Sequence, residues 1–436
     1  MYRVAMISVH SCPLAALGGK ETGGMNVYIR ELSRELAKKG LCIDIFTRSQ
    51  NPSIPNILNF QKNIRIIYLK AGPSAPYNKS KIWFHLPEFL HAIQQFSYER
   101  NVRYDLIHSH YWLSGWIGAK LSAMHNLPHL HMFHTLGYLK NKATQSLGIC
   151  EPPTRLKVEA QLVDMVDHIV VAGQKEKNMI RMIYGAPSEK ISVIPCGVDT
   201  EFFSPLNYAQ STVHLGLPNK KFILFVGRID PVKGIDTLIK AMHIVKTDLD
   251  SAHLPRLLVI GGDENTSDGI EAAEMRKLKQ LVATLGLKNE VSFLGAQKQD
   301  RLPFFYSVAE ICVLPSRYES FGMVALEAMA CGTPVIASNV GGLTSVIQDQ
   351  TTGFLVPADN EMVLAEKMLA LLKSPALKNT MGNAARAKVQ AFNWKEIAYQ
   401  TIALYHRLAE GKNNGVHAPS CSPEFHNRTA AAGLRS

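Results

Sequence analysis

The chain alternates short apolar runs with longer stretches in which apolar residues recur every three or four positions. Residues 25–40 show the second pattern: Val27, Leu32 and Leu36 share one helical face, and two lysines precede Gly40 at the end. In the first half of the chain, strands are expected at residues 3–9, 41–48, 104–110, 127–135, 168–173 and 191–195. Because strands that alternate with helices usually form a parallel sheet covered on both faces, the pattern predicts a doubly wound α/β domain.

The same alternation starts again after residue 220. Strands are expected at residues 221–230, 255–263, 291–295, 310–316 and 334–338, and helices at residues 234–246, 273–287 and 321–330. A chain of 436 residues is too long for one hydrophobic core. The predicted fold class is therefore α/β, with two doubly wound, Rossmann-like domains that face a cleft where a ligand binds beyond the carboxyl ends of the strands.

The stretch between the two halves, residues 195–211, is rich in proline, glycine and polar residues, which is typical of a hinge. We expect domains at residues 1–198 and 199–392, a last helix at 393–411 and a tail at 412–436. The tail has no apolar periodicity and many Gly, Pro, Ser and Asn residues, so it is predicted to be disordered.

Composition narrows the class of protein. Hydrophobic residues make up 46% and charged residues 19% of the chain, values typical of a globular enzyme, and the net charge is +11. A positive charge suits nucleic acid, an anionic membrane surface or anionic small substrates. No dense Lys/Arg block with interleaved aromatic residues occurs, so nucleic acid is not expected as a partner.

The seven cysteines are odd in number and scattered, and none forms a C-x-x-C pair, so neither a zinc site nor a disulfide framework is indicated. The start of the chain lacks the features of a signal peptide, and no apolar run is long enough to span a membrane. These features predict a cytoplasmic protein.

Glycines mark the first candidate for a binding loop. In residues 18–28, "GGKETGGMNVY", Gly23 and Gly24 lie directly before a predicted helix, where a backbone without side chains can approach a phosphate. The stretch is not G-x-G-x-x-G, so the dinucleotide fingerprint is missing. The alternative is a merely flexible loop.

A second candidate is the loop in residues 225–236, "FVGRIDPVKGID". Arg228 and Lys233 lie five positions apart directly after a strand, so both side chains can converge on one diphosphate. A solvated charged loop is the alternative interpretation.

The third candidate is residues 316–330, "SRYESFGMVALEAMA". The backbone N–H groups of Phe321, Gly322 and Met323 lie where a helix begins, so they can point at hydroxyls or a phosphate. Glu319 can accept hydrogen bonds from sugar hydroxyls, and Glu327, further along the helix, can bind both hydroxyls of a ribose.

These stretches together resemble the retaining nucleotide-sugar glycosyltransferases of family four, which have the GT-B fold. The resemblance runs from Val4 to about His406, and its most specific parts are "GRIDPVKGID" and the E-x7-E stretch "ESFGMVALE". It implies that the first domain binds the acceptor, that the second binds the nucleotide sugar, and that residues 393–411 cross back to the first domain.

Roles for individual residues follow from that resemblance. By the resemblance, Arg228 and Lys233 bind the donor diphosphate and stabilise the negative charge of this departing group. The donor hexose is held by Glu319 and the amides after it, the ribose by Glu327, and the β-phosphate lies near Gly23. His134, in "FHTLGY", takes the place of the active-site histidine, and His10 approaches the donor.

The first half is similar to one subgroup, the D-inositol-3-phosphate glycosyltransferases of mycothiol synthesis. The similar stretches include "AGPSAPYNKS", "YDLIHSHYWLSG", "FHTLGYLKN" and "EPPTRLKVE". By this resemblance the acceptor phosphate is bound by Lys79, Tyr111, Thr135 and Arg155, and the inositol is contacted by Asn26. Sucrose-phosphate synthases share much of the pattern, so it points to a phosphorylated acceptor more firmly than to inositol.

We therefore expect a retaining hexosyltransferase that uses a UDP-sugar and a phosphorylated acceptor, with UDP-N-acetylglucosamine and inositol phosphate as the best single pair. The alternatives are an enzyme like sucrose-phosphate synthase that uses UDP-glucose, a lipid glycosyltransferase that docks on anionic membranes, and a sugar-nucleotide-binding regulator without catalysis. A homodimer is left open. No cofactor is obligatory, although the resemblance allows Mg²⁺ at "FYSVAE", held by backbone oxygens.

Overall fold

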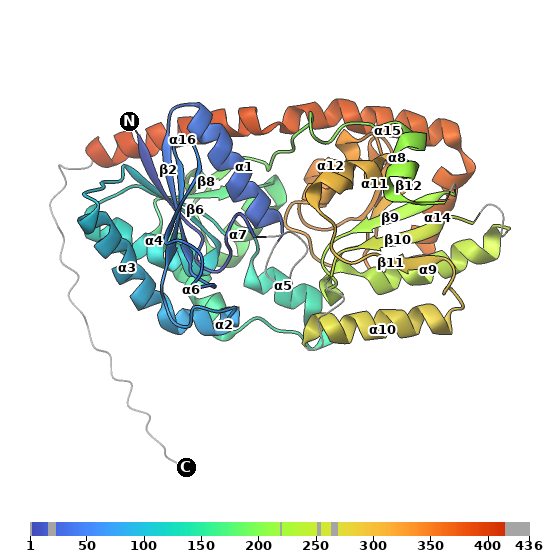
Figure 1. Ribbon diagram of the computed structural model, residues 1–436, viewed down its shortest axis with the longest axis horizontal. Coiled ribbons are helices and arrows are strands. Elements are labelled where there is room, and N and C mark those ends of the chain that lie inside the picture. The colour runs from blue at the N-terminus through green and yellow to red at the C-terminus, as the bar shows by residue number, and fades with distance from the viewer. Residues whose placement is uncertain (1, 16–22, 219, 251–253, 263–268, 415–436) are drawn as a thin grey trace, which may run out of the picture.

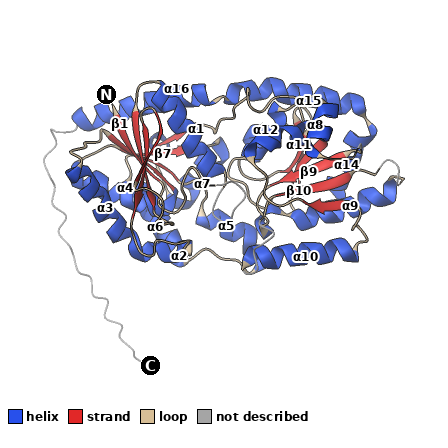
Figure 2. Ribbon diagram, in the orientation of Figure 1, coloured by secondary structure: helices blue, strands red, loops and turns tan. Residues whose placement is uncertain are grey.

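The computed structural model describes residues 2–15, 23–218, 220–250, 254–262 and 269–414. The two halves of the chain form separate α/β units that lie side by side, and the last helix runs along the first half (Figure 1). Each half is built around one sheet, as Figure 2 shows.

The sheet of the first half has, among the described residues, the strand order β3-β4-β2-β1-β5-β6-β7-β8. Its strands are β1 (Arg3–Ile7), β2 (Cys42–Arg48), β3 (Ile57–Gln61), β4 (Ile64–Leu69), β5 (Leu106–His110), β6 (His129–Met132), β7 (His168–Val171) and β8 (Ile191–Val193). The pairs are parallel except for β3 against β4. In register, Val4 of β1 lies between Ile43 of β2 and Leu106 of β5.

Helices cover both faces of this sheet. They are α1 (Gly24–Lys38), α2 (Lys79–Ile82), α3 (Leu86–Glu99), α4 (Tyr111–His125), α5 (Gly137–Thr144), α6 (Pro153–Met165) and α7 (Gln174–Tyr184). Because neighbouring strand residues point to opposite faces, Val4 and Met6 pack with α1, whereas Ala5 and Ile7 pack with α3, α4 and α6.

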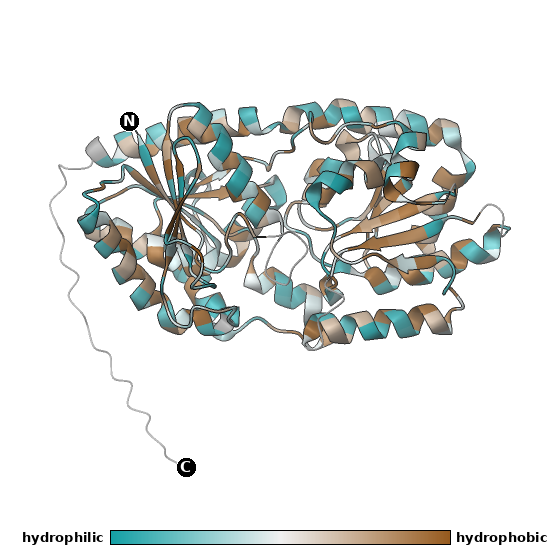
Figure 3. Cartoon of the chain, viewed as in Figure 1, coloured by the Kyte–Doolittle hydropathy of each residue, from teal (hydrophilic) through white to brown (hydrophobic). Residues whose placement is uncertain are grey.

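The second sheet has the order β11-β10-β9-β12-β13-β14 and is parallel throughout the described residues. Its strands are β9 (Phe222–Val226), β10 (Arg256–Ile260), β11 (Val291–Phe293), β12 (Ala309–Leu314), β13 (Val335–Ser338) and β14 (Gly353–Val356). Its helices are α8 (Tyr208–Leu215), α9 (Ile235–Asp248), α10 (Ile270–Thr284), α11 (Leu302–Val308), α12 (Met323–Ala330), α13 (Leu343–Val346), α14 (Glu361–Lys373) and α15 (Pro375–Val389). Figure 3 shows the strands of both sheets mostly in hydrophobic colours.

The final helix, α16 (Trp394–Asn414), packs on the first half although it follows the second. The hydroxyl of Tyr405 lies 2.8 Å from Nδ1 of His108 on β5, and the hydroxyl of Tyr399 accepts a hydrogen bond from Lys39 at 2.6 Å. The connection between the halves also lies against this region, since the Val198 N–H donates to the carbonyl of Phe392 at 2.7 Å.

The α/β class with two doubly wound sheets is confirmed, but some elements differ from the prediction. Three strands were not expected, β3, β4 and β14, and α8 begins at Tyr208, inside the stretch interpreted as a hinge. Strand β3 is hard to detect because its residues ILNFQ are only partly buried and pair with β4 alone. The helix at the end reaches Asn414, whereas residues 415–436 of the predicted tail lie outside the described residues.

In the part of the chain that the structure describes, none of the helices combines the length and apolar character needed to cross a membrane.

Candidate active site

A cavity of about 290 Å³ lies where the carboxyl ends of strands from both sheets meet. His10 follows β1, Tyr111 follows β5, His134 follows β6, Arg228 follows β9 and Ser316 follows β12, and all five line the cavity. In parallel sheets these ends are the usual place for a ligand. Of the residues expected from the sequence to bind donor or acceptor, the cavity brings together His10, Gly23, Gly24, Asn26, Lys79, Tyr111, His134, Thr135, Arg155, Arg228, Lys233, Glu319, Phe321, Gly322 and Met323.

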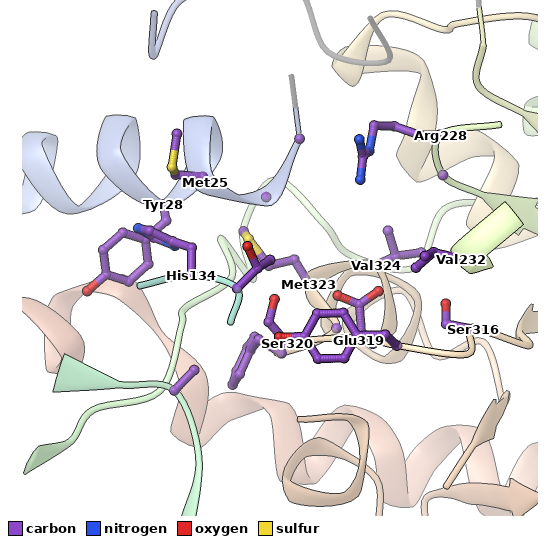
Figure 4. Close-up of a pocket in the computed structure, with 18 of the residues that line it drawn as sticks. Met25, Tyr28, His134, Arg228, Val232, Ser316, Glu319, Ser320, Met323 and Val324 are labelled. Atoms are coloured by element: carbon purple, nitrogen blue, oxygen red, sulfur yellow. The ribbon is translucent and has the colours of Figure 1, made fainter. Parts of the chain in front are cut away.

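Two cations reach the cavity from the loop after β9. Lys233 ends a short 3-10 turn, η4 (Pro231–Lys233), and its Nζ lies 2.6 Å from Oε2 of Glu319. Arg228 makes only a loose contact with Asp230, at 3.6 Å. Figure 4 shows Arg228 and Glu319 on opposite sides of the same space. The arrangement suits a ligand that carries both an anionic group and hydroxyls, because two cations and a carboxylate line the same cavity.

The polar residues before α12 hold this loop in place, which explains why a core helix is preceded by "SRYES". Arg317 donates hydrogen bonds to both carboxylate oxygens of Asp236, at 3.0 and 2.9 Å, and also to the carbonyl of Pro231 in η4. Tyr318 reaches the other half of the chain, where its hydroxyl accepts a hydrogen bond from the N–H of Leu136 at 3.1 Å. Neither residue was singled out from the sequence.

Glycines are required where the Glu319 loop meets α12. Gly322 has φ +96°, a left-handed conformation that other residues rarely adopt, and a Cβ there would lie 2.6 Å from Cδ2 of Leu343. Gly341 lies even closer, since its Cβ would meet the carbonyl oxygen of Glu319 at 1.8 Å. The backbone around Glu319 is thus fixed by close packing.

The N-termini of two helices face each other across the cavity. Gly24 begins α1, Met323 begins α12, and a Cβ on Gly24 would lie 3.3 Å from Sδ of Met323. Both first turns have N–H groups without partners in their own helix, and both helix dipoles favour a negative charge there. The site therefore favours an anion between the two halves.

Glu327 does not line this cavity. It lines a neighbouring one of about 190 Å³, together with Arg30, Arg34 and Met323. Its Oε2 accepts a hydrogen bond from the hydroxyl of Tyr306 at 2.7 Å, and burial raises the pKa of Glu327 to about 7. Its expected role in ribose binding stays a prediction.

On the opposite wall, Arg155 organises the residues expected to bind an acceptor phosphate. Its guanidinium donates to the hydroxyl of Tyr111 at 3.0 Å and to Oγ1 of Thr135 at 2.9 Å. It also pairs with Glu159 at 2.6 Å and with Glu151 at 2.9 Å. Arg155 is only 1% exposed, so it is a buried, paired cation and not a surface one.

Lys140 is a further cation of this wall that the sequence gave no reason to choose. It lies on α5, lines the cavity, and its Nζ contacts Oε1 of Glu151 at 2.6 Å. Burial alone would raise the pKa of Glu151, but Arg155 and Lys140 outweigh it and lower that pKa to about 2. Glu151 is therefore a carboxylate that links the two cations.

Tyr111 and His134 line the cavity, and both have an unusual backbone conformation. Their φ values are +75° and +59°, although neither is a glycine or an asparagine. Bulky residues with positive φ are strained, and such strain is found most often at functional sites. Burial lowers the pKa of His10 and of His134 to about 3, so both imidazoles are neutral at physiological pH.

Asn26 lines the cavity, but most of its hydrogen bonds are used within the protein. Its Nδ2 donates to Oγ of Ser11 and to the carbonyl of Cys12, both at 2.6 Å, and its Oδ1 accepts from the N–H of Gly23 at 3.0 Å. One lone pair of Oδ1 is left, so Asn26 can accept one further hydrogen bond. Its contact with an inositol stays a prediction.

No cluster of three or more His, Cys, Asp or Glu side chains within the described ranges could hold a metal ion. The segment "FYSVAE", where the sequence allowed Mg²⁺ on backbone oxygens, joins α11 to β12. That ion stays a prediction.

Two family models match the chain. The model described as "Glycosyltransferase Family 4" matches residues 22–202, and the one described as "Glycosyl transferases group 1" matches residues 210–388. The first match covers strands β2 to β8 of the first sheet, and the second covers all the described strands of the second sheet.

The chain is also similar to individual proteins along nearly its whole length. It is 36% identical to a D-inositol 3-phosphate glycosyltransferase of Kribbella flavida, over 94% of this chain and 96% of that protein. A protein of the same name from Corynebacterium glutamicum is 36% identical, over 94% of this chain and 98% of that protein. Among solved structures, a sucrose-phosphate synthase from Thermosynechococcus elongatus has a TM-score of 0.87 and 37% sequence identity to this chain. The match covers 94% of this chain and 100% of that structure.

Proposed function

Because the chain belongs to the family-four glycosyltransferases and has the GT-B fold, we propose that it transfers a hexosyl unit from a UDP-sugar to a phosphorylated polyol or sugar, with retention of configuration. N-acetylglucosamine or glucose is the proposed hexosyl unit, and inositol phosphate is the proposed acceptor. The observation that carries the proposal is one cavity lined by cations from both halves of the chain, Lys79, Lys140 and Arg155 from the first and Arg228 and Lys233 from the second.

The donor wall suits a nucleoside diphosphate sugar. Arg228, Lys233 and the first turns of α1 and α12 supply positive charge for the diphosphate, and Glu319 supplies an acceptor for sugar hydroxyls. In the proposed reaction the bond from the anomeric carbon to the diphosphate oxygen breaks, and a bond to the acceptor hydroxyl oxygen forms. The hydroxyl proton leaves with the diphosphate.

The acceptor wall suits a phosphate. Lys79, Lys140 and Arg155 line it, while the carboxylates of Glu151 and Glu159 pair with two of these three cations. A phosphate bound at this wall would contact Lys79, Lys140 and the hydroxyls of Tyr111 and Thr135.

The proposal is tested by steady-state kinetics with inositol phosphate, fructose 6-phosphate, glycerol phosphate and unphosphorylated inositol. Each charge-assisted hydrogen bond is worth about 1.5–3 kcal/mol, so two such contacts should raise kcat/KM for the phosphorylated acceptor roughly a hundredfold or more. Equal kcat/KM for inositol and inositol phosphate would remove the acceptor assignment.

A second candidate is an enzyme like sucrose-phosphate synthase, which would use UDP-glucose and a sugar phosphate. The TM-score of 0.87 and the 37% identity to such a synthase favour it. Both candidates share the donor wall and a phosphorylated acceptor, so the kinetic comparison of inositol phosphate with fructose 6-phosphate separates them.

A further inference from the structure

His134 is held by a second histidine that does not reach the cavity. His110 is the last residue of β5, is fully buried, and its Nδ1 lies 3.0 Å from Nε2 of His134. The contact places His110 directly behind a residue of the candidate active site.

Both rings are further confined by aromatic neighbours. The ring of Tyr28 lies edge-on to His134 at 5.2 Å and to His110 at 5.8 Å, and Figure 4 shows Tyr28 beside His134. His108, on the same strand as His110, packs its ring 4.3 Å away. Neither imidazole can therefore turn freely, and the hydrogen bond between them has a fixed geometry.

The remaining nitrogen of His110 decides the direction of this hydrogen bond. Nε2 of His110 is buried and has no hydrogen-bond partner among the residues that the structure describes. A neutral imidazole carries one N–H, and a buried N–H without an acceptor is rarer in proteins than an unpaired acceptor nitrogen. His110 is neutral because burial lowers its pKa well below the ordinary value. Its proton therefore belongs on Nδ1, which donates to His134.

We propose that His110 is a positioning residue, which fixes His134 in the tautomer that carries its proton on Nδ1. With Nε2 occupied as an acceptor, the only N–H of His134 is the one on the edge of the ring that does not contact His110. In water a histidine prefers the other tautomer, with the proton on Nε2, so the protein would impose the less common form.

The fixed tautomer gives His134 one defined function in the cavity. It can donate a hydrogen bond to an oxygen of the bound donor, and it cannot accept one through the nitrogen that is occupied. This consequence rests on the proposed function, whereas the tautomer itself does not. The two parts can therefore be tested separately.

The tautomer is read directly by ¹⁵N NMR of the full-length protein labelled with ¹⁵N-histidine, since protonated and bare ring nitrogens have very different shifts. The signals of His134 are identified by their loss in His134→Gln. We expect a bare Nε2 and a protonated Nδ1 in the unsubstituted protein near pH 7.5. A protonated Nε2 there would overturn the proposal without any variant of His110.

Substitutions of His110 test its role. His110→Phe removes the donor, so His134 should shift toward the Nε2–H form, and kcat should fall about tenfold, the worth of one hydrogen bond. His110→Asn should restore both the Nδ1–H tautomer of His134 and kcat, because the amide nitrogen of the asparagine occupies the place of Nδ1. His129→Phe is the matched control, since His129 is buried on β6 and bonds to Ser109 instead.

An unchanged tautomer in His110→Phe would contradict the proposal. If the tautomer behaves as expected but the protein transfers no sugar from any donor, the proposed function fails and the positioning of His134 stands.

Discussion

At the scale of single residues, the two cations of the loop after β9, Arg228 and Lys233, are the proposed binding groups for the donor diphosphate. They come from one short segment and face the same cavity as Glu319. A preorganised positive charge lowers the barrier most where negative charge develops, which in the proposed reaction is the departing diphosphate. The sequence was sufficient to predict that both residues lie at the cavity, because a pair of cations directly after a strand is a local pattern.

Replacing either cation should slow the chemical step. We expect Arg228→Ala or Lys233→Ala to lower kcat by roughly two to three orders of magnitude at saturating donor, the usual cost of losing such a contact. Lys240→Ala is the matched control, since Lys240 is exposed on the following helix and does not line the cavity. Near-normal kcat in both cavity variants would contradict the donor assignment.

The acceptor wall calls for a different choice of variant than the sequence suggested. Arg155→Ala would leave the buried carboxylate of Glu159 without its cation, and breaking a buried pair costs about 3–5 kcal/mol of folding stability. Its effect on the acceptor would then be confounded with loss of fold. Lys140 is 19% exposed in its side chain and can be removed more safely.

We therefore expect Lys140→Ala to raise KM for the phosphorylated acceptor about tenfold, with no change in KM for the UDP-sugar. Lys142→Ala, on the same helix but exposed and outside the cavity, should leave both constants unchanged. Equal effects of the two substitutions, measured by initial rates, would show that Lys140 does not contact the acceptor.

Glu327 should make stability depend on pH. Its pKa is raised to about 7 in the folded protein, so the folded state binds a proton more tightly than the unfolded state. The stabilisation that Glu327 contributes is fully present below the pKa that Glu327 has in the unfolded chain, and it is lost as the pH rises toward 7. The resulting decrease in the free energy of unfolding is at most about 3 kcal/mol.

In Glu327→Gln the gain in melting temperature over the unsubstituted protein should therefore increase between pH 4.5 and pH 7, and then level off. The difference between the two proteins isolates Glu327 from the buried histidines, which titrate in the opposite direction. A gain that is constant across this range, measured by thermal unfolding, would mean that Glu327 has an ordinary pKa.

At the scale of elements, the loops that follow the strands hold the cavity residues in place. The sequence predicted most of these strands and the beginnings of α1, α9 and α12, because hydrophobic periodicity and glycines are local signals. It did not predict β3, whose residues are only partly buried or exposed, or the contact of Arg317 with η4, which depends on a second contact with Asp236, 81 positions away.

The beginning of α12 gives a test at this scale. Gly322→Ala adds a strained left-handed residue and a close contact with Leu343, so we expect donor affinity to fall at least tenfold and stability to fall by more than 1–2 kcal/mol. Gly332→Ala is the control at the other end of the helix. It has φ +76° but its Cβ would meet nothing closer than 3.7 Å.

Binding of the donor, measured by titration calorimetry, should distinguish Gly322→Ala from Gly332→Ala. Gly332→Ala should lose about 1 kcal/mol of stability, the cost of the left-handed backbone, and keep its affinity for the donor. Comparable affinity in both variants would mean that the Glu319 loop does not depend on the packing at Gly322.

At the scale of the whole molecule, the site exists only where the two halves meet. Tyr318 of the second half accepts a hydrogen bond from the N–H of Leu136 of the first, and a Cβ added to Gly24, the first residue of α1, would lie 3.3 Å from Sδ of Met323, the first residue of α12. The residues around Arg155 come from α4, α6 and the loops near α5, up to 44 positions apart. A single sequence contains no local signal for such contacts, which is why Lys140 and Glu151 were missed.

The stereochemistry of the product follows from the same arrangement. The side chains of the cavity include Glu319 and Glu176, and Glu319 is already paired with Lys233. We therefore expect the anomeric configuration of the donor to be retained, on the basis of the E-x7-E pattern of the sequence and of the pairing of Glu319 with Lys233, which leaves Glu319 unsuited as a base. An NMR spectrum of the fresh product that shows inversion would contradict the proposed mechanism.

The central claim is the transfer of a hexosyl unit to a phosphorylated acceptor, and mass spectrometry of the reaction products tests it most directly. The protein is incubated with UDP-N-acetylglucosamine or UDP-glucose and with phosphorylated or plain inositol and fructose. We predict a product with the mass of the phosphorylated acceptor plus one hexosyl unit, and little or none from the plain acceptors. Glycosylation of the plain acceptors at an equal level, or no product from any phosphorylated acceptor, would contradict the account.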